Sequence, residues 1–135
     1  MKNKKIIFMG TPDIAAQHLS ILIENNINIV GVFTQPPRKK NRGMSIKISE
    51  VNQISKKNNL VVYHPSKIDE KVIEQTKILD PDLIIVIAYG MILPKEFLNI
   101  PKYGCINIHF SLLPRWRGAT PIEHSLLAGD KNTGI

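Results

Sequence analysis

The chain has 135 residues, 43% of them hydrophobic, and a formal net charge of +7. This length and apolar content predict one compact domain with a substantial core. The longest apolar run, residues 83–88, is far shorter than the ~20 residues of a membrane-spanning helix, which argues against a membrane protein. Cys105 is the single cysteine, so an internal disulfide is impossible, and no metal-ligand spacing occurs. We therefore expect a cytoplasmic monomer without a metal, and the positive charge favours an anionic partner such as nucleic acid.

Short apolar runs typical of β-strands alternate along the chain with segments of helical periodicity. The expected strands are residues 5–9, 27–34, 60–63, 83–88 and 105–109. The expected helices are residues 14–25, about 48–58, 69–79 and 121–127. We expect Asp13 to cap the first helix, Asp69 or Ser66 to open the third, and Pro81 to end it. Gly129 suits the end of the last helix.

This alternation predicts an α/β protein with a Rossmann-like, doubly wound, mostly parallel sheet that carries helices on both faces. Ligands of such folds bind beyond the carboxyl ends of the strands. Three segments leave strands there: GTPD at 10–13, YGMILP at 89–94 and HFSLLP at 109–114. The first lacks the GxGxxG dinucleotide fingerprint, which disfavours a plain nucleotide-binding domain.

Two polar residues interrupt the last predicted strand. Side chains alternate along a strand, so Cys105, Asn107 and His109 share one face. Asn107 and His109 would lie ~6.6 Å apart, a separation that could bracket one carbonyl group. Burying an amide and an imidazole without partners costs about 1–3 kcal/mol each, so the protein or a substrate must satisfy them. Each alone is more often structural, but their pairing at the ligand-binding end of a strand favours a catalytic site.

The loop after this strand could form one wall of a binding site. Its hydroxyl at Ser111, its apolar surface at Leu112 and Leu113 and its rigid ring at Pro114 would suit a flat heterocycle. Trp116 follows between two arginines and either stacks on nucleic acid or packs within the protein.

A basic segment is the clearest part of the chain outside the core. Residues 35–45 are predicted to form a long loop with two prolines, and no acid occurs between Glu24 and Glu50. The cations in and next to this loop are Arg38, Lys39, Lys40, Arg42 and Lys47. Such a loop can hold a phosphate backbone electrostatically, although a solvated surface loop would have the same composition.

Four segments together resemble a known family. They are FMGTPDIAAQHL at 8–19, FTQPPRKKNRG at 33–43, VIAYGMILP at 86–94 and NIHFSLLPRWRGATPIEHSLLAGDKNTGI at 107–135. In this order, and over essentially the whole chain, they resemble the formyltransferase domain of the methionyl-tRNA formyltransferase family. SLLP alone would mark folate-dependent formyltransferases in general, whereas GTPDIAAQHL with SLLPRWRGATPI is more particular to the tRNA enzyme.

The resemblance implies a reaction and a set of site residues. The formyl group of 10-formyltetrahydrofolate would pass to the amino group of methionine on initiator tRNA, a step in translation initiation. Asn107 and His109 fall on the family's catalytic asparagine and histidine, and residues 111–114 fall on its folate-binding loop. The segment from Arg38 to Lys47 falls on the basic loop that contacts tRNA, with Arg42 the favoured position.

The resemblance also implies parts that these residues do not contain. The family's catalytic aspartate falls beyond Ile135, and Asp130 belongs to the preceding turn. We therefore expect residues 1–135 to be an amino-terminal catalytic domain, incomplete at its C-terminal end, with little or no transferase activity alone. The family usually has an acid at the position of Pro37 and two lysines at positions 44–45, so the tRNA contacts are expected to differ in detail.

A mechanism follows from the residue types. A neutral amine attacks the formyl carbon, and Asn107 and His109 donate hydrogen bonds to the oxygen on which negative charge gathers. Losing one such donor typically costs about 10²–10³ in rate, and a base must remove the proton of the amine.

Two alternatives stay open. One is another folate-dependent formyltransferase that acts on a small amine, such as a glycinamide ribotide or an amino sugar nucleotide. The other is a non-catalytic nucleic-acid-binding module, in which Asn107→Ala and His109→Ala would leave function intact while Arg42→Ala would impair it.

Overall fold

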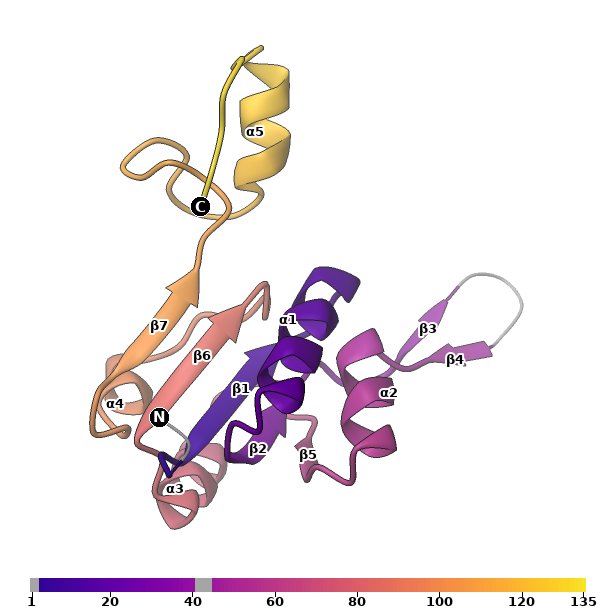
Figure 1. Ribbon diagram of the computed structural model, residues 1–135, viewed down its shortest axis with the longest axis vertical. Helices are drawn as coiled ribbons and strands as arrows, with labels where there is room; N and C mark the ends of the chain where they lie inside the picture. Colours follow the sequence, from indigo (N-terminus) through magenta and orange to yellow (C-terminus); the bar gives the residue numbers. More distant parts are fainter. Residues whose placement is uncertain (1–2, 41–44) are drawn as a thin grey trace.

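The fold is taken from a computed structural model that describes residues 3–40 and 45–135. Five of its strands form one parallel sheet in the order β5-β2-β1-β6-β7, and two more form a separate antiparallel hairpin (Figure 1). The elements are β1 (Ile6–Gly10), α1 (Asp13–Glu24), β2 (Ile29–Phe33), β3 (Arg38–Lys40), β4 (Ser45–Lys47), α2 (Glu50–Lys57), β5 (Val62–Tyr63), α3 (Glu70–Leu79), β6 (Leu83–Ile87), α4 (Lys95–Leu98), β7 (Cys105–Ile108) and α5 (Pro121–Leu127).

Helices cover both faces of the parallel sheet. On one face, Leu19 of α1 and Val51 of α2 pack in a core cluster with Phe8 of β1. On the other face, Val72 of α3 and Phe97 of α4 belong to a second cluster. Every residue of β1 is buried, because β1 has a strand on each side and helices above and below. These layers confirm the predicted doubly wound α/β fold.

The helix boundaries agree with the sequence prediction to within one or two residues, but one predicted cap is wrong. Asp69 caps α3, since its carboxylate accepts a hydrogen bond from the backbone N–H of Val72 at 3.2 Å. Asp13 instead lies inside the first turn of α1, where it accepts a hydrogen bond from Gln17. Pro12, in an extended conformation, holds the N-cap position because its carbonyl accepts the first helical hydrogen bonds.

The basic segment differs from the predicted long loop. Its backbone forms the hairpin β3–β4, in which Arg38 lies opposite Lys47, and these two strands (residues 38–40 and 45–47, here called the arm) project from the body in Figure 1. The hydroxyls of Thr34 and Ser49 are 2.8 Å apart and join the segments that precede and follow the arm. Strands of three residues are too short to show alternation, so no pattern along the chain indicated them.

The last part of the chain stands at the carboxyl end of the sheet. β7 forms an edge of the sheet, and α5 lies beyond the strand ends in Figure 1. α5 begins at Pro121 and is followed by Gly129 with a φ of 69°, as the sequence predicts. Over the described ranges, 3–40 and 45–135, no helix has the length and apolar character to cross a membrane.

Candidate active site

A cavity of about 840 Å³ opens at the carboxyl ends of β6 and β7. Its walls come from the start of α1, the turn after β6, β7 with the residues that follow it, and the start of α5. Most of the lining is contributed by residues 88–93, 107–110 and 118–123. This is the edge of the sheet at which a doubly wound fold binds its ligands.

Asn107 and His109 both line this cavity. Asn107 lies opposite Val86 of β6, and His109 follows the last residue of β7. The strand alternates as predicted, because Cys105 packs against one core cluster and Ile108 against the other. The structure therefore brings the two predicted catalytic residues to one cavity.

One ring nitrogen of His109 is already engaged. Its Nε2 lies 2.9 Å from the carbonyl oxygen of Trp116. A carbonyl oxygen can only accept, so Nε2 carries the proton and donates it in this hydrogen bond. In the neutral ring, Nδ1 is then unprotonated and can accept a proton or a hydrogen bond.

The predicted folate-binding loop lies apart from this lining. Ser111 is buried and its hydroxyl donates to the carbonyl of Arg115 at 2.7 Å. Leu112 and Leu113 are 54% and 59% exposed, and Pro114 is exposed as well. Among the described residues, those that line the cavity after Phe110 begin at Gly118 rather than at 111–114.

Trp116 packs within the protein. Its ring stacks on His124 with centroids 5.5 Å apart, and the guanidinium of Arg115 lies 4.2 Å from its ring centre. Its indole N–H donates to Asp130 at 2.7 Å. Arg115 donates two hydrogen bonds to the same carboxylate, at 2.9 and 2.8 Å. The hydrogen bonds from Arg115 and then Trp116 lower the pKa of Asp130 to about 2, so this carboxylate is ionised. It connects the loop between β7 and α5 to the turn that follows α5.

The turn after β6 belongs to the segment 89–94, which the sequence placed at the ligand-binding edge without a role for any single residue, and it supplies residues to the cavity. Tyr89 is 2% exposed, and its hydroxyl has no hydrogen-bond partner within the described part of the chain. Burial raises the pKa of Tyr89 to about 12, so its hydroxyl stays protonated. The signal in the sequence was Gly90, three residues after the end of the apolar strand β6, where the backbone turns with a φ of 78°.

The backbone of the arm carries four of the five predicted tRNA-contacting residues. The backbone of β3 carries Arg38, Lys39 and Lys40, and Lys47 ends β4. Arg42 lies outside the described residues.

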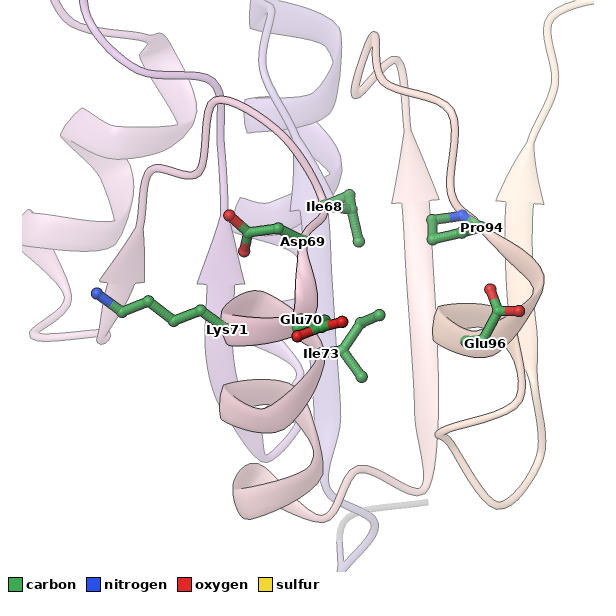
Figure 2. Close-up of a pocket in the computed structure, with 7 residues that line it drawn as sticks. All are labelled: Ile68, Asp69, Glu70, Lys71, Ile73, Pro94 and Glu96. Atoms are coloured by element: carbon green, nitrogen blue, oxygen red, sulfur yellow. The ribbon is translucent and has the colours of Figure 1, made fainter.

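A second hollow, between the start of α3 and α4, is a weaker candidate (Figure 2). It is lined by Ile68, Asp69, Glu70, Lys71, Ile73, Pro94 and Glu96. Three carboxylates against one ammonium give it an acidic character, which disfavours an anionic ligand. In residues 3–40 and 45–135, no cluster of three or more His, Cys, Asp or Glu side chains could hold a metal ion.

Comparisons with known proteins bear on the family and the fold of this chain. Residues 4–135 match the family model described as formyl transferase. The chain is 54% identical to the methionyl-tRNA formyltransferase of Francisella philomiragia and 52% identical to that of Francisella tularensis subsp. mediasiatica. Each alignment covers the whole chain and 44% of the relative, so the chain spans less than half the length of these relatives.

Two solved structures share the fold. A phosphoribosylglycinamide formyltransferase from Bacillus halodurans is similar with a TM-score of 0.75 at 19% identity, over 96% of this chain and 68% of that one. A formyltetrahydrofolate deformylase from Pseudomonas syringae pv. tomato is similar with a TM-score of 0.72 at 20% identity, over 96% of this chain and 43% of that one. At these identities the similarity shows the Rossmann-like fold alone.

Proposed function

Since the chain belongs to the formyl transferase family, we propose that it carries the catalytic domain of an enzyme that formylates the amino group of methionyl initiator tRNA. The formyl donor is 10-formyltetrahydrofolate, and the reaction belongs to translation initiation in the cytoplasm. The observation that supports this proposal most is the meeting of Asn107 and His109 in one cavity at the carboxyl end of the sheet. The 54% identity to a named methionyl-tRNA formyltransferase supports the choice of acceptor.

The cavity fits a folate in size and chemistry. Its volume of about 840 Å³ is within the usual range for small-molecule sites, roughly 300–1,000 Å³. Apolar side chains such as Met91, Leu93 and Ile108 line it and suit a flat pteridine ring. A polar ligand atom near Tyr89 would give its buried hydroxyl the partner that the described residues lack. The bound folate would supply the formyl group, and residues 111–114 remain part of the proposed site on the family resemblance alone.

The hydrogen bond between His109 and the Trp116 carbonyl leads us to propose different catalytic roles for Asn107 and His109. The amide N–H of Asn107 donates to the formyl oxygen as negative charge develops on it. A neutral His109 has no second N–H to donate, because its Nε2 proton is bound to the Trp116 carbonyl. We therefore assign Nδ1 of His109 the task of accepting the proton from the attacking amine, in place of the donor role first expected. The same nitrogen returns this proton to N10 of tetrahydrofolate as the bond between N10 and the formyl carbon breaks, so the step balances.

A chimaera tests the chemistry. This chain would replace the matched 44% of the Francisella philomiragia enzyme, and formylation of methionyl-tRNA would be measured with 10-formyltetrahydrofolate. Asn107→Ala and His109→Ala should each lower kcat by about 10²–10³, whereas Asn28→Ala, at an exposed position before β2, should not. Formylation of a small amine in place of methionyl-tRNA would favour a different formyltransferase. The 135-residue chain alone should show little or no turnover, and robust turnover would refute that expectation.

A measurement of tRNA binding tests the proposed role of Arg42 and the basic segment around it. Arg42→Ala should weaken tRNA binding and lower the dependence of log Kd on log salt by about 1, because one phosphate contact is lost. Lys57→Ala removes the same charge from an exposed position on α2 and serves as the control. If only Arg42→Ala impairs function while Asn107→Ala and His109→Ala do not, the chain is a nucleic-acid-binding module.

A further inference from the structure

Glu123, in the first turn of α5, is the single acidic residue that lines the cavity within the described part of the chain. No lysine or arginine of the described ranges lines the cavity, so the wall supplies no cation to pair with this carboxylate. Over residues 3–40 and 45–135, the Glu123 side chain makes no hydrogen bond or ion pair. The residue is also exposed, so its carboxylate is available to a ligand that enters the cavity.

Two contacts of Trp116 hold the start of α5 near His109. The Trp116 carbonyl accepts the hydrogen bond from Nε2 of His109 at 2.9 Å, and the Trp116 ring stacks on His124 with centroids 5.5 Å apart. Glu123 directly precedes His124, and successive side chains of a helix point about 100° apart. While His124 faces Trp116, Glu123 therefore lines the cavity together with His109.

The amine of the proposed acceptor arrives at the cavity with a positive charge. The ordinary pKa of an α-amino group is about 7.7–8.0, so most of it is an ammonium at pH 7. An ammonium has three N–H donors and no acceptor, and a carboxylate satisfies it with charge-assisted hydrogen bonds. Tetrahydrofolate, in contrast, carries an anionic glutamyl tail, which a carboxylate repels. The charge of Glu123 therefore suits the acceptor amine better than the tail of the formyl donor.

We propose that Glu123 binds the ammonium group of the acceptor and holds it beside His109. This inference rests on the proposed function and deepens it, because it names the residue that recognises the amine. The bound ammonium first releases one proton to solvent, while Glu123 stays a carboxylate. The neutral amine then attacks the formyl carbon and gives its second proton to Nδ1 of His109, so the proton transfers of the proposed mechanism are unchanged.

Two ligands that differ in one group test this contact. One is adenosine with methionine attached at its 3′ position through a stable amide, and the other has a hydroxyl in place of the α-amine. Their Kd values for the chain would be measured at pH 7 with saturating tetrahydrofolate. Because solvent screens an exposed ion pair, we expect the amine to bind about threefold more tightly in the wild type, and no preference in Glu123→Gln. Glu70→Gln removes the same charge from the first turn of α3, and this matched control should keep the preference. Equal ratios of the two Kd values in wild type and Glu123→Gln would overturn the proposal.

Kinetics of the chimaera separate the acceptor from the donor. Glu123→Gln should raise KM for methionyl-tRNA about threefold and leave kcat within about twofold, because the lost contact holds the substrate as well as the transition state. The Kd of tetrahydrofolate should stay unchanged. Weaker tetrahydrofolate binding would instead place the carboxylate on the N–H groups of the pteridine and overturn the proposal. A chain that binds tetrahydrofolate but shows no preference for the amine refutes the role of Glu123 alone, whereas a chain that binds neither ligand refutes the proposed function as well.

Discussion

Replacing Tyr89 by phenylalanine removes one buried hydroxyl and leaves the ring in place. The ring is 2% exposed and belongs to the core cluster that includes Phe97, so its packing is kept in the variant. The hydroxyl is buried and has no hydrogen-bond partner within the described residues, and Tyr89 is one of the residues that line the proposed folate cavity. The ligand-free protein therefore carries the cost of desolvating this group, and we propose that the ligand relieves it.

The expected change in stability follows from that cost. Burying a hydroxyl without a partner costs about 1–3 kcal/mol in protein mutational data. Tyr89→Phe should therefore raise the free energy of unfolding by about 1–3 kcal/mol in the absence of ligand. For a domain of this size, each kcal/mol corresponds to roughly 4 °C in Tm. If the proposed ligand supplies the missing partner of this hydroxyl, the same change also weakens tetrahydrofolate binding.

Urea unfolding and a titration with tetrahydrofolate measure the two effects on the same samples. Tyr103→Phe is the control, because that ring is 55% exposed and its hydroxyl already accepts a hydrogen bond from Lys4 at 3.0 Å. The reasoning is refuted if Tyr89→Phe loses stability, since the hydroxyl would then have a partner in the ligand-free protein. A variant that gains stability and binds tetrahydrofolate as tightly as before would show that the Tyr89 hydroxyl does not contact the ligand.

Three further predictions concern stability. Gly10→Ala should cost about 1–3 kcal/mol in the free energy of unfolding, because the new Cβ would lie 2.6 Å from a methyl group of α1. Asp69→Ala should cost about 1 kcal/mol by removing a helix cap, whereas Asp13→Ala, which removes no cap, should cost less than about 0.5 kcal/mol in the same urea titration. The hydrogen bonds from Arg115 lower the folded-state pKa of Asp130 to about 2 from an ordinary 3.8. Its contribution to stability is thus present above pH 3.8 and is lost as the pH falls toward 2, so Asp130→Asn should flatten that part of a curve of Tm against pH.

Local patterns were enough to predict the fold. Apolar runs bounded by turn residues mark the five strands of the parallel sheet, and each long helix shows its own periodicity. The elements that the sequence did not indicate are β3, β4 and α4, each of three or four residues. Elements this short contain no full period of either pattern, so their formation depends on contacts made by the folded chain.

The part of the candidate site that a single strand positions, Asn107 and His109, could be predicted from the sequence. Alternation places Asn107 and His109 on one side of β7, and the parallel sheet places that end of the strand at the binding edge. The position of residues 111–114 depends instead on how the following loop folds. That loop is held by contacts of Arg115 and Trp116 with Asp130, which lies 15 and 14 residues further along the chain, and no pattern in the sequence indicates these contacts. For the same reason the sequence could not decide whether Trp116 packs or binds nucleic acid.

The chemistry of His109 depends on this same loop. A histidine in the sequence does not show which ring nitrogen carries the proton, but the Trp116 carbonyl, seven residues later, fixes it on Nε2. Trp116 is held in turn by Asp130, which does not line the cavity. Asp130→Asn should therefore loosen the carbonyl that orients His109. In the chimaera we expect kcat to fall roughly tenfold while the Kd of tetrahydrofolate stays unchanged, since Asp130 lies outside the folate cavity. An unchanged kcat in that variant would mean that His109 acts without the help of the Trp116 carbonyl.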